Sequence, residues 1–324
     1  MGRHNKSIHS KQPSDSAATN QPRNLLITDV TEPFDFCFRR YDVTIALTVY
    51  QTPEEEVWPG GALWDLGVLL AQVLVLLTRG ATLPSNTQST VPKRLLQAIP
   101  DISWKGMRVL ELGCGVGLTG LVAAALGAKV TLLTDLQVVV DKVAKKNVEC
   151  NTLTGPNKLC GYRTTPTGGR VVAMPLCWGD EHDEEETKAA LERLAPKKMM
   201  RCRSNKGETK TTRGEGIPDL ILIGDVAYQH KPGAPSHFEA LLSTVLKFMD
   251  KETIVLFGTR MRMPASADLL DLFRKHMVEL VTPPLEAHEL NASLCEKELR
   301  RKHNITIHVL KLRRDSSEVD HTCE

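Results

Sequence analysis

The chain has 324 residues, enough for one domain of about 200 to 250 residues with additional tails. Hydrophobic residues make up 41% of the sequence and charged residues 25%, which is typical of a soluble globular protein. The formal net charge is only +2, so no overall electrostatic field favours a nucleic acid or a membrane as partner.

The N-terminal part of the chain changes character at about residue 29. Residues 1–28 are polar, so we expect a disordered tail, and they lack the apolar core of a secretory signal. Aromatic and β-branched residues dominate 34–50, interrupted near the middle by two arginines and an aspartate, which predicts a β-hairpin. An apolar helix follows from about Ala62. Its longest apolar stretch, 66–77, is about 12 residues long, too short to cross a bilayer.

Beyond a loop with one short helix at 93–98, apolar strand-like runs alternate with helical segments. We expect strands at 107–112, 129–134, 170–176, 218–223, 253–258, 278–281 and 304–312, and helices at 118–126, 137–151, 235–249 and 266–277. Continuous apolar strands separated by helices predict an α/β fold with a doubly wound, mostly parallel seven-stranded sheet covered on both faces. One domain over 29–313 and a polar tail at 314–324 are therefore expected.

One segment, between Trp178 and Pro218, interrupts this alternation. It contains an acidic stretch at 180–186, a short amphipathic helix and the basic run K-K-M-M-R-C-R-S-N-K-G-E-T-K-T-T-R-G-E-G. A connection of this length is unusual between strands. We interpret 196–216 as a flexible basic insertion, and a basic arm that faces the substrate is the alternative.

Three glycines lie between a predicted strand and a predicted helix, in the sequence R-V-L-E-L-G-C-G-V-G-L-T-G. Glycines at such a turn let a ligand lie against bare backbone, while the helix N-terminus supplies amide donors. Glu111 precedes the turn, and Asp135 ends the next strand, where a carboxylate is suited to bind the two hydroxyls of a ribose. Residue 118 is leucine, so the turn is not the G-x-G-x-x-G of a pyrophosphate binder.

Four patches of the sequence resemble the class I, seven-β-strand methyltransferases, and within them the methyltransferase-like 21 group of protein-lysine methyltransferases. The patches are L-W-D-L-G-V-L-L-A-Q-V-L, V-L-E-L-G-C-G-V-G-L-T-G-L-V-A-A-A-L-G-A-K-V-T-L-L-T-D-L, P-L-C-W-G-D and D-L-I-L-I-G-D-V-A-Y, within residues 34–312. The resemblance implies a Rossmann-like fold, S-adenosyl-L-methionine as cofactor and the lysine side chain of a protein as methyl acceptor.

The resemblance also implies which residues contact the cofactor. In that family the glycine turn, with Glu111 beside it here, holds the methionine end of the cofactor. Asp135 corresponds to the acid that binds the ribose, and Trp178 corresponds to an aromatic residue beside the adenine. Trp64 corresponds to the tryptophan of the group's first motif, with Trp58 as a competitor. The full set of implied cofactor residues is Trp64, Glu111, Gly113, Cys114, Gly115, Asp135, Trp178 and Gly224.

At the reacting end, Asp225 and Tyr228 correspond to the D-x-x-Y motif of these lysine methyltransferases. A lysine amine has a pKa of about 10.4 and is protonated in water, so Asp225 is expected first to attract and orient the ammonium. Tyr228 is expected to narrow the channel and aim the nitrogen lone pair. Capping of the next helix is the structural alternative for Asp225. Arg260, after a later strand, is a candidate for the substrate rim.

Two other classes of function remain open at this point. One is a methyltransferase of small molecules or nucleic acids, for which the basic run 197–213 is the candidate feature; Val226-Ala227, in place of two prolines, disfavours a planar nitrogen acceptor. The other is a non-catalytic module with a methyltransferase fold.

The histidines form no ligand cluster, so no metal is expected. The eight cysteines are scattered without a C-x-x-C pair, which favours reduced thiols and a cytoplasmic or nuclear protein. A monomer is the default.

Overall fold

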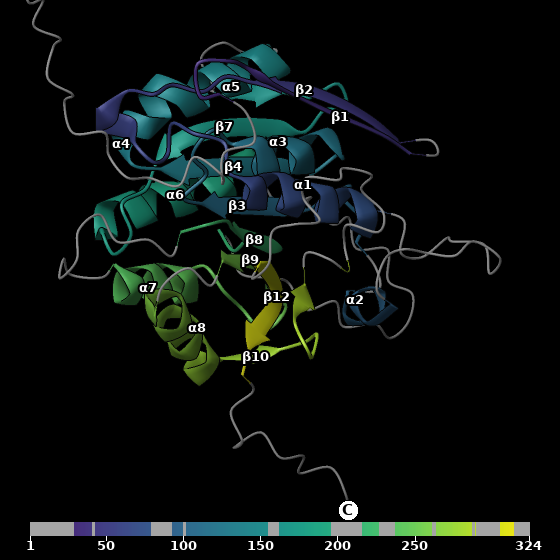
Figure 1. Ribbon diagram of the computed structural model, residues 1–324, viewed down its shortest axis with the longest axis vertical. Coiled ribbons are helices and arrows are strands. Elements are labelled where there is room, and N and C mark those ends of the chain that lie inside the picture. Colours follow the sequence, from purple (N-terminus) through teal and green to yellow (C-terminus); the bar gives the residue numbers. More distant parts are fainter. Residues whose placement is uncertain are drawn as a thin grey trace, which may run out of the picture.

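A computed structural model describes residues 29–40, 43–78, 93–99, 102–154, 162–195, 216–226, 237–260, 264–286, 289 and 305–313. A central β-sheet runs through the molecule, with helices on both of its faces (Figure 1). The predicted tails at 1–28 and 314–324 and nearly all of the predicted insertion at 196–216 lie outside the described residues.

The central sheet has the strand order β10-β12-β9-β8-β3-β4-β7-β6-β5, and β11 pairs with β12. Five neighbouring strands are parallel: β3 (Arg108–Leu112), β4 (Val130–Asp135), β7 (Arg170–Pro175), β8 (Leu220–Ile223) and β9 (Ile254–Arg260). β12 (Ile305–Leu312) is antiparallel to β9, and β10 (Met277–Glu279) is antiparallel to β12. All seven predicted strands are confirmed.

Three further strands of two residues each extend the sheet beyond the prediction. They are β5 (Leu153–Thr154), β6 (Arg163–Thr164) and β11 (Leu285–Glu286). Two residues are too few to show a hydrophobic period, so the sequence gives no signal for such short strands.

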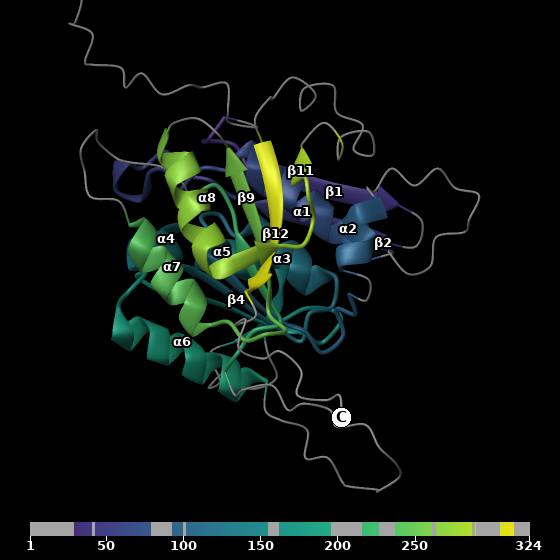
Figure 2. The same ribbon diagram turned by 90° about the horizontal axis from the view of Figure 1, so that it is seen from below.

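The helices cover the two faces of the sheet as predicted (Figure 2). One side carries α1 (Asp65–Leu77), α2 (Lys93–Ala98), α3 (Leu118–Ala125), α4 (Gln137–Val139), the π-helical turn η3 (Val140–Ala144) and α5 (Lys145–Asn151). The other side carries α6 (Glu181–Leu194), α7 (Phe238–Lys247) and α8 (Pro264–His276). Alternate strand residues therefore pack into two cores, with Leu220 and Leu222 in one and Ile221 and Ile223 in the other.

The acidic stretch at 180–186 is not a segment separate from the predicted short helix. It forms the first half of α6, which has 14 residues. The Asp180 side chain accepts a hydrogen bond from the Asp183 backbone N–H at 3.0 Å and so caps the helix N-terminus. Acidic residues stabilise this end because its unpaired N–H groups carry partial positive charge.

The predicted hairpin consists of β1 (Phe34–Arg40) and β2 (Val43–Val49), paired antiparallel with Phe36 opposite Leu47. Alternate side chains such as Phe36 and Leu47 are buried in the core, whereas Asp35, Cys37 and Ala46 are exposed. The hairpin thus packs one face onto the domain and lies beside α5 (Figure 1).

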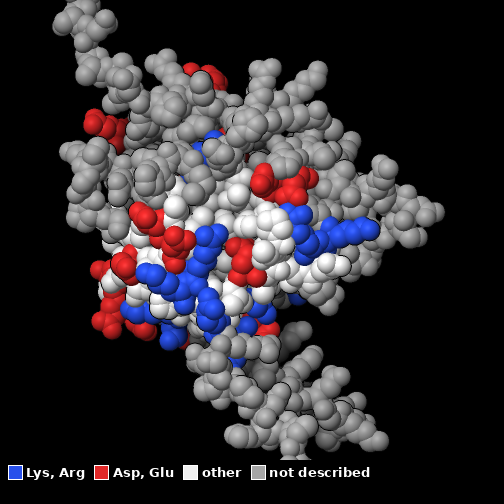
Figure 3. Space-filling model, turned by 60° about the horizontal axis from the view of Figure 1, so that its bottom comes forward, with Lys and Arg blue, Asp and Glu red and all other residues white. Residues whose placement is uncertain are grey.

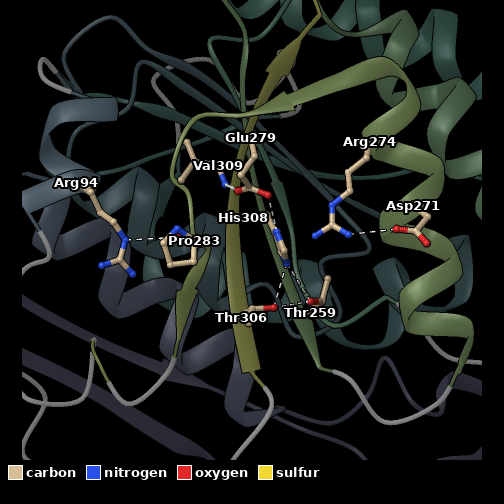
Figure 4. Close-up of polar contacts among 9 residues, drawn as sticks. All are labelled: Arg94, Thr259, Asp271, Arg274, Glu279, Pro283, Thr306, His308 and Val309. Atoms are coloured by element: carbon tan, nitrogen blue, oxygen red, sulfur yellow. Dashed lines mark hydrogen bonds and ion pairs between the residues drawn. The ribbon is translucent and has the colours of Figure 1, made fainter.

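A buried polar cluster ties the antiparallel edge of the sheet together (Figure 4). His308, on β12, is 2% exposed, and its Nδ1 lies 2.8 Å from Glu279 Oε2. The other Glu279 oxygen accepts a hydrogen bond from the Val309 N–H at 3.0 Å, and His308 Nε2 lies 3.0 Å from the Thr306 hydroxyl. These contacts join side chains and backbone of two strands, so the cluster has a structural role at this edge.

Charged side chains of both signs lie beside one another on the face shown in Figure 3. Ion pairs of this kind join Arg274 to Asp271 at 3.1 Å and Lys311 to Glu252 at 3.5 Å. Among the described residues, no helix is long and apolar enough to cross a membrane.

Candidate active site

A cavity of about 380 Å³ lies where the parallel strands end at their carboxyl side. It is lined by residues that follow β3, β4, β7 and β8, including Gly113, Leu136, Trp178 and Asp225. The chain crosses from β3 to β4 on one side, whereas β8 lies on the other side of β3. Open α/β sheets bind their ligands in such a crevice, at the point where the strand order reverses.

The structure brings the predicted cofactor residues together around this cavity. All eight of them line it: Trp64, Glu111, Gly113, Cys114, Gly115, Asp135, Trp178 and Gly224. Asp225 lines it as well, and both of its carboxylate oxygens are buried. Tyr228 lies outside the described residues. The geometry therefore makes one site of residues that are up to 161 positions apart, from Trp64 to Asp225.

The glycine turn brings bare backbone to the cavity wall. Gly113, Gly115 and Gly117 have φ angles of 68°, 53° and 79°, a left-handed region that disfavours other residues. A Cβ on Gly113 would lie 2.9 Å from Val226 Cγ1 and 3.2 Å from Trp178 Cζ2. Any side chain at residue 113 would therefore displace a wall of the cavity.

Asp135 links the end of β4 to the glycine turn. Its Oδ2 accepts a hydrogen bond from the Gly115 N–H at 2.8 Å, and its Oδ1 accepts one from the Leu136 N–H at 2.8 Å. Burial raises the pKa of the Asp135 carboxyl, and these two N–H donors oppose the rise. Each oxygen has a second lone pair, so the carboxylate retains acceptor capacity for two hydroxyl groups.

Glu111 is 4% exposed at the end of β3 and faces the helix that follows the turn. Its Oε2 accepts a hydrogen bond from the Gly120 N–H at 2.9 Å; a Cβ on Gly120 would lie 2.6 Å from the same oxygen. Burial raises the pKa of the Glu111 carboxyl from 4.5 to about 8; the Gly120 N–H opposes this rise and the Asp135 charge adds to it. A cation in the cavity would favour the ionised form of this acid.

Two tryptophans in the segment before α1 contact each other at the cavity. The rings of Trp58 and Trp64 are 5.7 Å apart between centroids and meet edge to face at 64°. The Trp64 indole N–H donates to the Pro59 carbonyl at 3.1 Å. Both rings line the cavity, so the choice between Trp58 and Trp64 is not an exclusive one.

A wall of the cavity that the sequence reasoning mostly missed is the strap, which we define as residues 50–64. Within it, Gln51 Oε1 accepts a hydrogen bond from the Leu63 N–H at 2.7 Å, and the Thr52 N–H donates to the Gly61 carbonyl at 2.9 Å. These bonds fold residues 56–64 back toward the cavity, which most of them line. The P-G-G sequence predicts a turn, but nothing in it identifies the strand ends that it faces.

The strap is joined to η3 by ion pairs. Lys142, in η3, lies 2.9 Å from Glu54 and 2.7 Å from Glu56, and all three side chains are about half exposed. Hydrogen bonds to these glutamates raise the pKa of the Lys142 ammonium. His237, before α7, is a further lining residue that the prediction omitted.

Arg260 is not at the substrate rim, and this expectation is wrong. The residue ends β9 but is 5% exposed, and its guanidinium forms an ion pair with Asp65, which is 0% exposed. A buried charge requires such a partner, so the pair fixes the start of α1 against β9. Trp64 immediately precedes α1, and its position at the cavity therefore depends on this pair.

Residues 44–192 match a family described as lysine methyltransferase. Over these residues, which are less than half of the chain, the protein is similar to that family. The matched region contains the strap, the glycine turn, Asp135 and Trp178, but ends before Asp225.

Individual methyltransferases are also similar to the chain, at modest identity. Protein N-lysine methyltransferase METTL21A of Danio rerio is 31% identical over 161 residues, 50% of this chain and 53% of that protein. EEF1A lysine methyltransferase 3 of Mus musculus is 35% identical over 83 residues, 25% of this chain and 29% of that protein. The chain thus spans about half or less of the length of these curated relatives.

Among solved structures, a TehB-like S-adenosylmethionine-dependent methyltransferase of Corynebacterium glutamicum is similar at a TM-score of 0.35 and 13% identity. The match covers 76% of this chain and 98% of that one. At this level of similarity the strand order and the helices on both faces, rather than the match, define the fold. Among the described residues, no group of three or more His, Cys, Asp or Glu could hold a metal ion.

Proposed function

We propose that the protein transfers the methyl group of S-adenosyl-L-methionine to a lysine side chain of a protein substrate. The observation that carries the proposal is the position of Asp225: it follows β8 and lines the same cavity as Glu111 and Asp135. One acid that would bind the acceptor, Asp225, thus shares a site with two acids that would bind a cationic nucleoside, Glu111 and Asp135. The match of residues 44–192 to a family described as lysine methyltransferase supports a lysine as acceptor.

The cavity fits the cofactor in size and in chemistry. Its volume of about 380 Å³ is within the usual range for small-molecule sites. Asp135 would accept hydrogen bonds from the ribose hydroxyls, and Glu111 with the bare turn at Gly113 would hold the cationic amino-acid part. The apolar surfaces of Leu136 and Trp178 would contact the adenine. When bound, the cofactor supplies a methyl group activated by its sulfonium charge.

Asp225 would position the acceptor rather than act mainly as a base. A carboxylate attracts the lysine ammonium to the cavity but stabilises its charged form, which has no lone pair for attack. Two factors oppose this stabilisation of the charged lysine: the burial of the carboxylate, and the positive charge of the sulfonium. The lysine ammonium must therefore pass its proton to water or to Asp225 before the N–C bond forms, and we propose that Tyr228 then aims the neutral amine.

An arginine side chain is the second candidate acceptor, because one relative favours it. Histone-arginine methyltransferase METTL23 of Rattus norvegicus is 28% identical over 215 residues, which are 65% of this chain and 75% of that protein. Its coverage is greater than that of the lysine-specific relatives described above.

For the assembly and compartment, we propose a monomer in the cytoplasm, with the nucleus as a second compartment.

The test is methylation of a cell lysate with labelled S-adenosylmethionine by the wild type and by Asp225→Asn. We expect label in protein that yields methyl-lysine on hydrolysis, and about a 100-fold lower rate with the variant, because a misplaced acceptor loses the in-line geometry. Methyl-arginine would favour the second candidate. Label in nuclease-sensitive or small-molecule fractions would contradict a protein acceptor, and absence of cofactor binding in calorimetry would indicate a non-catalytic module.

A further inference from the structure

Two asparagines of α5 bind the backbone of β2 and of Tyr50, the residue that follows β2, in the same way. Asn151 Oδ1 accepts from the Thr48 N–H at 2.9 Å, and its Nδ2 donates to the Thr48 carbonyl at 2.7 Å. Asn147 Oδ1 accepts from the Tyr50 N–H at 2.7 Å, and its Nδ2 donates to the Tyr50 carbonyl at 2.9 Å. Each amide therefore acts as one residue of an additional strand.

The spacing explains why a helix can bind a strand edge in this manner. Helix residues four apart are separated by about 6 Å along the axis, and strand residues two apart by about 6.6 Å. Asn151 thus meets Thr48 and Asn147 meets Tyr50, and the N–H and C=O groups of these two residues point the same way. The two amides attach the hairpin to the domain.

The two asparagines differ in their third hydrogen bond. Asn147 Nδ2 also donates to the Val116 carbonyl at 2.9 Å, whereas Asn151 Nδ2 donates to the Asn147 carbonyl, within its own helix, at 2.8 Å. Val116 belongs to the glycine turn and lines the cavity. Asn147 is 0% exposed, so water cannot replace its amide without rearrangement. The π-helical turn η3 ends just before α5, and such turns are frequent beside functional sites.

Asn147 consequently connects two walls of the cavity. One wall is the glycine turn, held through the Val116 carbonyl, and the other is the strap, which begins at Tyr50. The two walls also meet directly, since the Gly60 carbonyl oxygen would lie 3.0 Å from a Cβ on Gly115. Only a neutral amide can accept from one N–H and donate to two carbonyls here, because an aspartate cannot donate and an alkyl side chain does neither.

We infer that Asn147 is a positioning residue for cofactor binding: it holds the glycine turn against the strap, so that the backbone of both walls faces the ligand. Asn151 attaches the hairpin without this connection. The inference rests on the proposed function for the identity of the ligand, but its geometric part, the fixing of the turn by Asn147, does not.

The experiment compares Asn147→Ser with the matched control Asn151→Ser. Asn147→Ser loses the two bonds to Tyr50 and the bond to Val116. Asn151→Ser loses the two corresponding bonds to Thr48 and a bond within its own helix, but no bond to the glycine turn. Calorimetry with S-adenosylhomocysteine at 10 °C, after circular dichroism has shown that both variants are folded, should give a Kd about tenfold higher for Asn147→Ser. The Kd of Asn151→Ser should stay within about twofold of the wild type. Equal Kd values for the two variants would overturn the inference.

Hydrogen exchange of the ligand-free proteins gives a second measurement, which does not depend on the cofactor. Peptides that cover 113–120 should exchange faster in Asn147→Ser than in Asn151→Ser and the wild type. If the wild type binds no S-adenosylhomocysteine, the proposed function fails, and the exchange result alone decides whether Asn147 holds the turn. Equal exchange in the two variants overturns the inference even if Asn147→Ser does not fold well enough for calorimetry.

Discussion

Replacement of Glu111 by glutamine should make the protein more stable at alkaline pH. The folded protein holds the pKa of this carboxyl at about 8, against 4.5 ordinarily, mainly because the side chain is buried. Between these two values the unfolded chain binds fewer protons than the folded one, so the stability that depends on Glu111 falls as the pH rises. Glutamine can still accept the hydrogen bond from the Gly120 N–H but cannot ionise.

The magnitude follows from proton linkage. Between pH 6 and pH 8 the wild type should lose roughly 2–3 kcal/mol of unfolding free energy through Glu111, relative to Glu111→Gln. For a domain of this size that loss corresponds to a difference in Tm of roughly 5–10 °C. Burial also raises the pKa of Asp135, which both proteins retain, so the difference between the two proteins is the quantity to measure.

The assay is thermal unfolding of both ligand-free proteins in one buffer series from pH 5 to pH 9. The two Tm curves should lie closest at pH 5 and separate steadily toward pH 8. Parallel curves over the whole range would refute the reasoning, because they would mean that the Glu111 carboxyl already ionises near its ordinary pKa in the folded protein.

Three further substitutions test other contacts of the structure. Lys142→Met breaks the exposed ion pairs to the strap, so stopped-flow measurements should show that S-adenosylhomocysteine dissociates about two- to fivefold faster. Lys145→Met, on the same helical segment, should leave the dissociation rate unchanged. Asp65→Asn leaves Arg260 buried without its anionic partner and should cost about 3–5 kcal/mol in urea unfolding, most of which the double variant with Arg260→Met should recover. His308→Phe should cost about 1–3 kcal/mol by the same measurement without a change in cofactor Kd, since the residue lies at the antiparallel edge.

The carboxyl ends of the strands were the part of the site most readable from the sequence. Glu111, Asp135 and Gly224 each stand at or just after the end of an apolar run, and parallel strands place such positions at one edge of the sheet. Local sequence therefore predicted which residues share the cavity, although it could not show what they bind. Strand and helix boundaries were correct to within about three residues.

The contacts between segments distant in sequence were not readable. Arg260 looks like any polar residue at the end of a strand, and only the packing of α1 on β9 shows that it is paired with Asp65 and buried. The strap and Asn147 were missed for the same reason, since the Asn147 amide serves backbone groups 31 and 97 positions away. Side chains that satisfy the backbone of remote segments have no periodic pattern.

The protonation of Glu111 should also affect which form of the cofactor the site prefers. S-adenosylmethionine and S-adenosylhomocysteine differ by the sulfonium charge, and only an ionised carboxylate in the cavity attracts that charge strongly. As the pH rises through about 8 the Glu111 carboxyl ionises, so the ratio of the Kd for S-adenosylhomocysteine to that for S-adenosylmethionine should increase. Calorimetry of both ligands at pH 6.5 and pH 9 measures this ratio, with Glu111→Gln as the control whose ratio stays nearly constant. An equal change in the variant would assign the effect to another group, with Asp135 as the nearest candidate in the same cavity.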